Sequence, residues 1–114
     1  MIEMEYQIGR QNTKETLFRL KKAIQFIKEV VNDHKKKPIT HMSFALMLAI
    51  SKADELRDQV DSFCPAYRSF QELSEMLRYL PNSYDARVIA ERCLEHIRDY
   101  FELEKIELRR KERI

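Results

Sequence analysis

A regular apolar repeat runs through residues 42–63, MSFALMLAISKADELRDQVDSF. The apolar positions, alternately four and three residues apart, are Met42, Leu46, Ala49, Ala53, Leu56, Val60 and Phe63. Steps of this size keep side chains on one face of a helix with 3.6 residues per turn. Because the repeat lasts for three heptads, it predicts a helix over 41–63 that packs on another helix in the manner of a coiled coil. Thr40 is expected to cap its start.

The same spacing of apolar residues predicts a preceding helix over 13–35. Its apolar positions are Leu17, Leu20, Ile24, Ile27 and Val31. The sequence Asn12-Thr13-Lys14-Glu15 has the form of a capping box, which places the start of the helix there. Residues 1–11 are then expected to fray.

Two more helices are expected over 66–80 and 83–111, because Pro65 and Pro81 interrupt the chain before each of them. The residues expected to face inward are Phe70, Leu73, Leu77 and Leu80 in the shorter helix, and Val88, Ala90, Leu94, Ile97 and Phe101 in the longer one. At 1.5 Å per residue the last helix would be about 42 Å long, against about 33 Å for the first or second. Residues 104–114 are therefore predicted to protrude from the bundle as its overhanging end.

The composition supports a helical fold. Of the 114 residues only one is glycine and 35% are charged. The chain therefore has too few of the glycines that tight turns favour to form a sheet of many strands. We predict a single-domain, all-α, up-down antiparallel bundle of four helices. The longest apolar run, 42–50, is far shorter than the roughly 20 residues that span a bilayer. The N-terminus does not resemble a secretory signal, so we expect a cytoplasmic protein without membrane contact.

A row of lysines follows the first helix. Lys14, Lys21, Lys28 and Lys35 recur every seven residues beside the apolar stripe. Residues 11–37 hold eight basic and three acidic residues, whereas the whole chain has a net charge of +2. The row fits three interpretations: a solvated edge whose aliphatic stems cover the core, a docking surface for an acidic protein, or contacts to a nucleic-acid backbone. No base-reading motif accompanies it.

The opposite face of the 42–63 repeat is apolar at its start and acidic at its end. Phe44 and Met47 lie in the apolar half. The third and fourth helices are expected to cover them as ordinary core, and the alternative is a seam with a second copy or a groove for a partner helix. Asp54, Asp58 and Asp61 share the acidic half and are expected to form a solvated face rather than a metal site.

The histidines and cysteines do not complete a metal site in the sequence. Cys93 and His96 lie one helical turn apart and offer two zinc ligands, and a closed site would need two more, such as Cys64 and His41. Two cysteines make no disulfide framework, so both are expected to be free, buried thiols.

The function favoured by these patterns is a non-enzymatic interaction module. It would act as an adaptor, inhibitor or regulator that binds another protein through helix faces, as a homo-oligomer and without a cofactor. The candidate partner-binding residues are Lys14, Lys21, Lys28, Lys35, Phe44 and Met47. The first alternative is sequence-nonspecific binding of nucleic acid by the lysine row. The second, a metal-dependent helical hydrolase, has the least support, because Glu72-x-x-Glu75 lacks the following Glu-x-x-Asp of all-α pyrophosphohydrolases.

Overall fold

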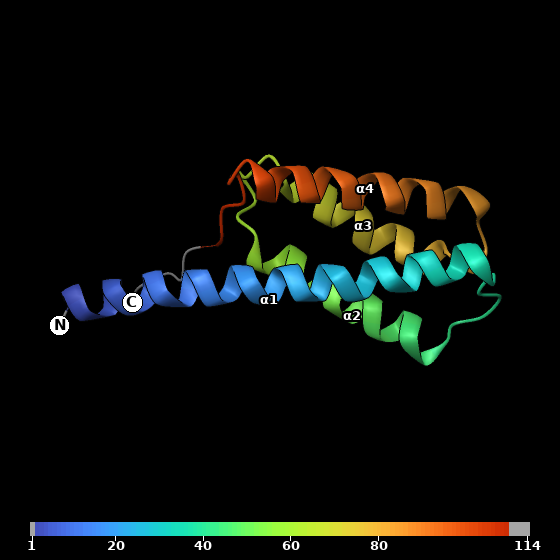
Figure 1. Cartoon of the computed structure of the whole chain (residues 1–114), viewed down its shortest axis with the longest axis horizontal. Coiled ribbons are helices and arrows are strands. Elements are labelled where there is room, and N and C mark those ends of the chain that lie inside the picture. The colour runs from blue at the N-terminus through green and yellow to red at the C-terminus, as the bar shows by residue number, and fades with distance from the viewer. Residues whose placement is uncertain (1, 110–114) are drawn as a thin grey trace.

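The part of the chain that the structure describes folds into four helices joined by short loops (Figure 1). The computed structural model describes the backbone of residues 2–109 and the side chains of residues 14–109. The helices are α1 (Ile2–Lys36), α2 (Phe44–Gln59), α3 (Tyr67–Tyr79) and α4 (Tyr84–Glu102). Successive helices run in opposite directions, and each packs on the next, with α4 returning to α1. The all-α, up-down antiparallel bundle predicted from the sequence is thus confirmed.

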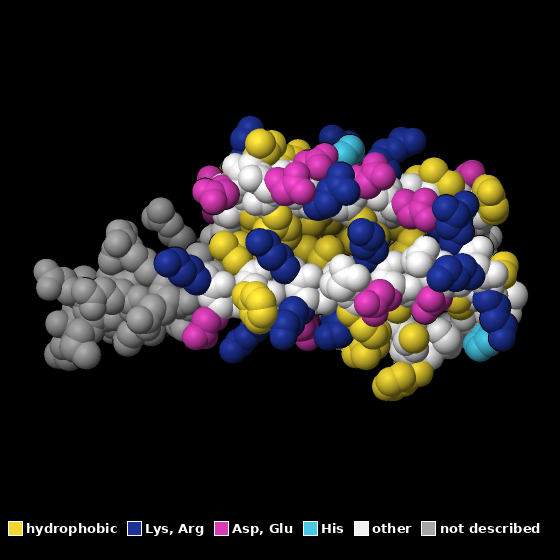
Figure 2. All heavy atoms as spheres, in the orientation of Figure 1, with side chains coloured by type: hydrophobic (Ala, Val, Ile, Leu, Met, Phe, Trp, Pro, Cys, Tyr) yellow, Lys and Arg dark blue, Asp and Glu magenta, His cyan; other side chains and the backbone are white. Residues whose placement is uncertain are grey.

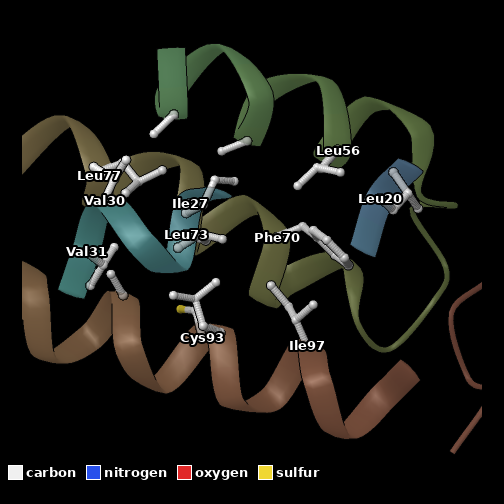
Figure 3. Close-up of a cluster of buried hydrophobic side chains, with 14 of the residues drawn as sticks. Leu20, Ile27, Val30, Val31, Leu56, Phe70, Leu73, Leu77, Cys93 and Ile97 are labelled. Atoms are coloured by element: carbon white, nitrogen blue, oxygen red, sulfur yellow. The ribbon is translucent and has the colours of Figure 1, made fainter. Parts of the chain in front are cut away.

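The four helices enclose one cluster of buried apolar side chains. In Figure 3, Ile27 of α1, Leu73 of α3 and Ile97 of α4 converge in the centre of the bundle, and all three are fully buried. All four predicted inward positions of α3 are buried, as are the five middle positions of the α2 repeat, Leu46, Ala49, Ala53, Leu56 and Val60. Burial of each large side chain stabilises the fold by about 1.5–3 kcal/mol. The apolar repeats therefore identify most of the core. The inward prediction is wrong for Met42, Phe63 and Val88, which are exposed because the first two lie outside α2 and Val88 lies on the outer side of α4.

Helix α1 begins well before its predicted start. It runs from Ile2, so the predicted capping box at residues 12–15 lies inside the helix and residues 2–11 are helical. The residues before the box include Glu, Met, Gln and Arg, which favour helices, and no proline. Extending an existing helix by one residue is far easier than starting a new one, so the helix continues through the box.

Helix α2 is shorter at both ends than predicted. Its N-cap is Ser43 rather than Thr40, and the Ser43 hydroxyl accepts a hydrogen bond of 3.2 Å from the backbone N–H of Leu46. The helix ends at Gln59 because Val60 adopts an extended conformation. Three positions of the predicted repeat, Met42, Val60 and Phe63, therefore lie outside the helix.

The predicted overhang of the last helix is wrong, because α4 ends at Glu102. Glu104 has a left-handed backbone (φ 54°), which turns the chain back toward the end of α2. There, Leu108 forms an isolated antiparallel bridge with Val60, and the N–H of Arg109 donates to the carbonyl of Gln59 at 2.7 Å. Residues 110–114 lie outside the described chain.

Cys64 also holds this C-terminal segment. Its thiol donates to the carbonyl oxygen of Lys105 at 3.1 Å, and its sulfur accepts from the N–H of Glu107 at 3.4 Å. Ile106 and Leu108 pack against the core and are half-buried. These long-range contacts replace the hydrogen bonds that a helix continuing to residue 111 would make.

Candidate partner-binding groove

A groove of about 710 Å³ lies between α1 and α4, the two adjacent helices that pack least closely. Its floor is apolar and is formed by Ile24 and Val31 of α1 together with Leu94 and Phe101 of α4. Figure 2 shows hydrophobic side chains between a row of basic residues along α1 and a row of mainly acidic residues along α4. The groove therefore combines an apolar floor with two charged walls.

The wall on α1 carries three members of the predicted lysine row, and the carboxylate of Glu29 beside them leaves its net charge positive. Lys21, Lys28 and Lys35 line the groove, and all three are exposed; we refer to them as the cationic wall. The ammonium nitrogen of Lys21 lies 5.5 Å from the centroid of the Phe101 ring, within the range of a cation–π contact. Lys14 is exposed farther along α1 and does not line the groove. Three of the four lysines therefore share one site.

The wall on α4 carries the opposite charge. Glu91, Glu95 and Glu102 line it, and we refer to them as the anionic wall. Arg98 is the only basic residue among the α4 residues that line the groove, and its Nε lies 4.0 Å from a carboxylate oxygen of Glu102. Among the described side chains, no ion pair within 4 Å joins α1 to α4. Arg87 of the same helix binds Glu91 at 3.0 Å. Because these ion pairs lie within α4 and do not cross the groove, a ligand in the groove can contact the charges of both walls.

The anionic wall is not among the features predicted from the sequence, although the sequence contains a signal for it. Glu91, Glu95, Arg98 and Glu102 follow one another at steps of four, three and four residues, so they share a face of α4. That face flanks the apolar stripe containing Leu94, as the lysines flank the stripe of α1. Only the packing of α4 beside α1 places the two faces on opposite sides of one groove.

A second exposed surface lies at the start of α2. Met42, Phe44, Met47 and Leu48 are exposed there, Phe44 at 79% and Met47 at 53%; we refer to them as the apolar patch. Figure 2 shows hydrophobic side chains protruding where α2 begins. The expectation that α3 and α4 cover Phe44 and Met47 is wrong. Because α2 buries the stripe that contains Leu46 and Ala49, its opposite face points out of the bundle.

The acidic half of α2 is only partly solvated. Asp54 contacts α3, where Arg78 binds its Oδ2 at 2.7 Å and the buried Ser74 hydroxyl donates to its Oδ1. Burial alone would raise the pKa of Asp54, but the hydrogen bonds from Arg78 and Ser74 and the charge of Arg78 lower it overall. Asp58 is exposed, as predicted, while Asp61 accepts a hydrogen bond from the N–H of Phe63 at 2.9 Å. Asp54 therefore has a structural partner rather than a solvated environment.

The candidate zinc ligands are separated. Cys93 is buried in the core, whereas His96 on the same helix is exposed. Cys64 lies beneath the C-terminal segment, and His41 is exposed in the loop before α2. Among residues 14–109, no group of three or more His, Cys, Asp or Glu side chains is arranged to hold a metal ion.

Both cysteines are free and buried, as predicted. Burial, with a smaller effect from the charge of Glu72, raises the pKa of the Cys93 thiol to about 11. The nucleophilic form of cysteine is the thiolate, and very little of it exists near neutral pH at such a pKa. Cys93 is therefore a core side chain that is poorly suited to nucleophilic catalysis.

The strongest candidate for a binding site is thus the groove between α1 and α4. Within the described chain, no helix is both long and apolar enough to cross a membrane. No family model matches the sequence, and neither a curated protein nor a solved structure matches the chain.

Proposed function

We propose that this chain is a protein-binding module without enzymatic activity of its own, and that its partner docks in the groove between α1 and α4. The observation that carries the proposal is an apolar floor flanked by a cationic and an anionic wall. Protein interfaces commonly have an apolar centre and a polar rim, and grooves between helices accept amphipathic segments of a partner. Such a module acts as an adaptor, inhibitor or regulator by holding another protein.

The anionic wall favours a protein over nucleic acid as the partner. A nucleic-acid backbone gains affinity when lysines neutralise its phosphates and counterions are released. A backbone lying on the cationic wall would also bring phosphates close to Glu91, Glu95 and Glu102, and repulsion would offset much of that gain. A protein presents both signs of charge and so complements both walls at once.

A photo-crosslinking experiment tests this proposal. A benzophenone amino acid replaces Asn32, which lines the groove, or Glu55, which is exposed on α2 and does not line it. In extracts of the source cells we expect one discrete protein adduct with the Asn32 probe and none with the Glu55 probe. Excess unmodified chain should suppress the adduct. Equal labelling from both positions, or adducts to nucleic acid alone, would contradict the proposal.

Self-association through the apolar patch is a separate part of the proposal. Large apolar side chains that cluster on a surface are typical of contacts with another molecule, and Phe44 is 79% exposed. We expect sedimentation velocity at tens of micromolar to show an oligomer that Phe44→Ser and Met47→Ser together convert to a monomer. A wild-type chain that is strictly monomeric at these concentrations would rule out this part.

A further inference from the structure

We propose that the groove selects an amphipathic helix with acidic residues along one flank and basic residues along the other. This inference rests on the proposed function and defines the chemistry of the partner. Its basis is the arrangement of the two walls: the cationic wall lies on α1 and the anionic wall on α4, and both border the same apolar floor. A helix that lies along the groove would place each flank against one wall.

The dimensions of the groove fit a short helix. The cationic wall extends from Lys21 to Lys35, which corresponds to about 21 Å, or four turns, along the axis of α1. A partner of about 14–16 residues covers this length. Its apolar stripe would fill the hollow above Ile24, Val31 and Leu94. The side chains in that stripe should be as large as leucine or methionine, because the groove has a volume of about 710 Å³ above an apolar floor.

A second copy of the same groove is a poorer occupant than a single helix. Two grooves placed face to face would enclose an empty cavity. The side chains that line such a cavity lack the dispersion contacts that stabilise close-packed interfaces. A helix instead presents a convex ridge of side chains. The concave shape of the groove therefore favours a ridge from a different molecule.

The charges also match along the length of the groove. Because α1 and α4 are antiparallel and Lys21 contacts Phe101, Lys21 lies near the Glu102 end of α4, and Lys35 lies toward the Glu91 end. Acidic residues seven apart on one flank of a helix meet the lysines, which have the same spacing. Basic residues on the other flank meet the carboxylates. A partner helix whose acidic and basic flanks were exchanged would meet the same two walls only if it lay in the opposite direction along the groove. The walls therefore also select the direction in which the partner helix runs.

Two fluorescent peptides of identical composition test this arrangement with the full-length chain. Both have the same leucine stripe and a hydrocarbon staple on the outer face to keep them helical. In the opposite-flank peptide, all acidic residues lie on one side of the stripe and all basic residues on the other. In the alternating-flank control, acidic and basic residues alternate on each side. We expect the opposite-flank peptide to bind at least about tenfold more tightly at low salt, and salt to reduce the difference.

Charge reversal of the cationic wall provides the second arm. The double variant Lys28→Glu, Lys35→Glu makes both walls anionic, and we expect it to lose at least about tenfold in affinity for the opposite-flank peptide. It should gain affinity for a third peptide that has basic residues on both flanks. The control variant Lys22→Glu, Lys36→Glu makes the same charge change on exposed residues of α1 that do not line the groove. We expect this control to keep the wild-type preference.

The inference would be overturned by equal affinities for the first two peptides, by no binding of any peptide, or by equal effects of the two double variants. If no peptide binds but the Asn32 probe still captures a protein, the inference fails and the proposed function stands. If neither the peptides nor the probe finds a partner, both fail. Loss of self-association in the Lys28→Glu, Lys35→Glu variant alone would identify a second copy as the occupant and would also overturn the inference.

Discussion

Asp54 joins α2 to α3, and its replacement by asparagine should destabilise the bundle measurably. The carboxylate receives hydrogen bonds from Arg78 at 2.7 Å and 3.2 Å and from the hydroxyl of Ser74. The same guanidinium donates to the Ser74 hydroxyl at 2.9 Å, so the three side chains form one closed network. Asparagine keeps the size of the side chain and removes its charge.

The expected size of the effect follows from the exposure of the partners. The side chain of Arg78 is 45% exposed, so water can solvate it when the carboxylate is gone, and its ion pair is worth only about 0.2–1 kcal/mol. Ser74 is fully buried, and its hydrogen bond to a charged acceptor is worth about 1.5–3 kcal/mol. The asparagine oxygen still accepts a neutral bond from Ser74. We therefore expect Asp54→Asn to lower the free energy of unfolding by about 1–2 kcal/mol at pH 7.

The same network makes the effect depend on pH. Because Arg78 and Ser74 lower the pKa of Asp54 in the folded chain, the unfolded chain takes up a proton first as the pH falls. The contribution of Asp54 to stability is present above its ordinary pKa and is lost as the pH falls through the lower, folded value. The difference between wild type and Asp54→Asn should therefore shrink as the pH falls below the ordinary aspartate pKa of about 4.

Urea unfolding followed by circular dichroism measures this difference, and Asp58→Asn is the matched control. Asp58 lies one turn away, and its side chain is 66% exposed and contacts only its neighbour Arg57. We expect the control to stay within about 0.5 kcal/mol of wild type, as exposed substitutions usually do. Equal destabilisation by the two variants, or an Asp54→Asn effect that does not change between pH 7 and pH 3, would show that the Asp54 network does not stabilise the bundle in this way.

Three further predictions concern His34, the core and Cys93. Burial and the charge of Arg87 lower the pKa of His34, and its Nδ1 accepts from the N–H of Ile39 at 2.8 Å; stability should therefore fall as the pH drops below about 6.5. His34→Gln should flatten this dependence in urea titrations at several pH values. Ile27→Ala should lower the free energy of unfolding by about 2–5 kcal/mol, because Ile27 is fully buried. A calorimetric midpoint unchanged from wild type would contradict that assignment. At pH 8 the raised pKa of Cys93 leaves about a hundredfold less thiolate than an ordinary thiol, so iodoacetamide should modify it correspondingly slowly in the folded chain.

The fold could be predicted because each helix has its own apolar stripe. Residues such as Leu46, Leu73 and Ile97 fall at helical spacing in the sequence and are buried in the structure. The ends of α2 and α4 could not be predicted in the same way. The backbone of Val60 pairs with that of Leu108, 48 residues later in the chain. No local pattern signals that pairing, while the residues around both positions continue to suggest a helix.

The candidate site could be predicted only in part, for a related reason. The lysines were visible as a heptad row on α1, but the ligand they suggest depends on what faces them. The glutamates that face the lysines across the groove belong to α4, and the sequence does not show which side of α4 lies next to α1. The partner of Asp54 is likewise set by the packing of α3. Charge patterns within one helix are local, whereas a site with two walls arises from tertiary packing.

Backbone amide chemical shifts of the full-length chain, recorded with and without the opposite-flank peptide, test the groove most directly. We expect the perturbed amides to follow both walls, over residues 21–35 of α1 and 91–102 of α4. The amides around Phe44 in the apolar patch should remain unchanged. Perturbations confined to α1, or centred on the apolar patch, would contradict the claim that the groove with its two oppositely charged walls is the binding site.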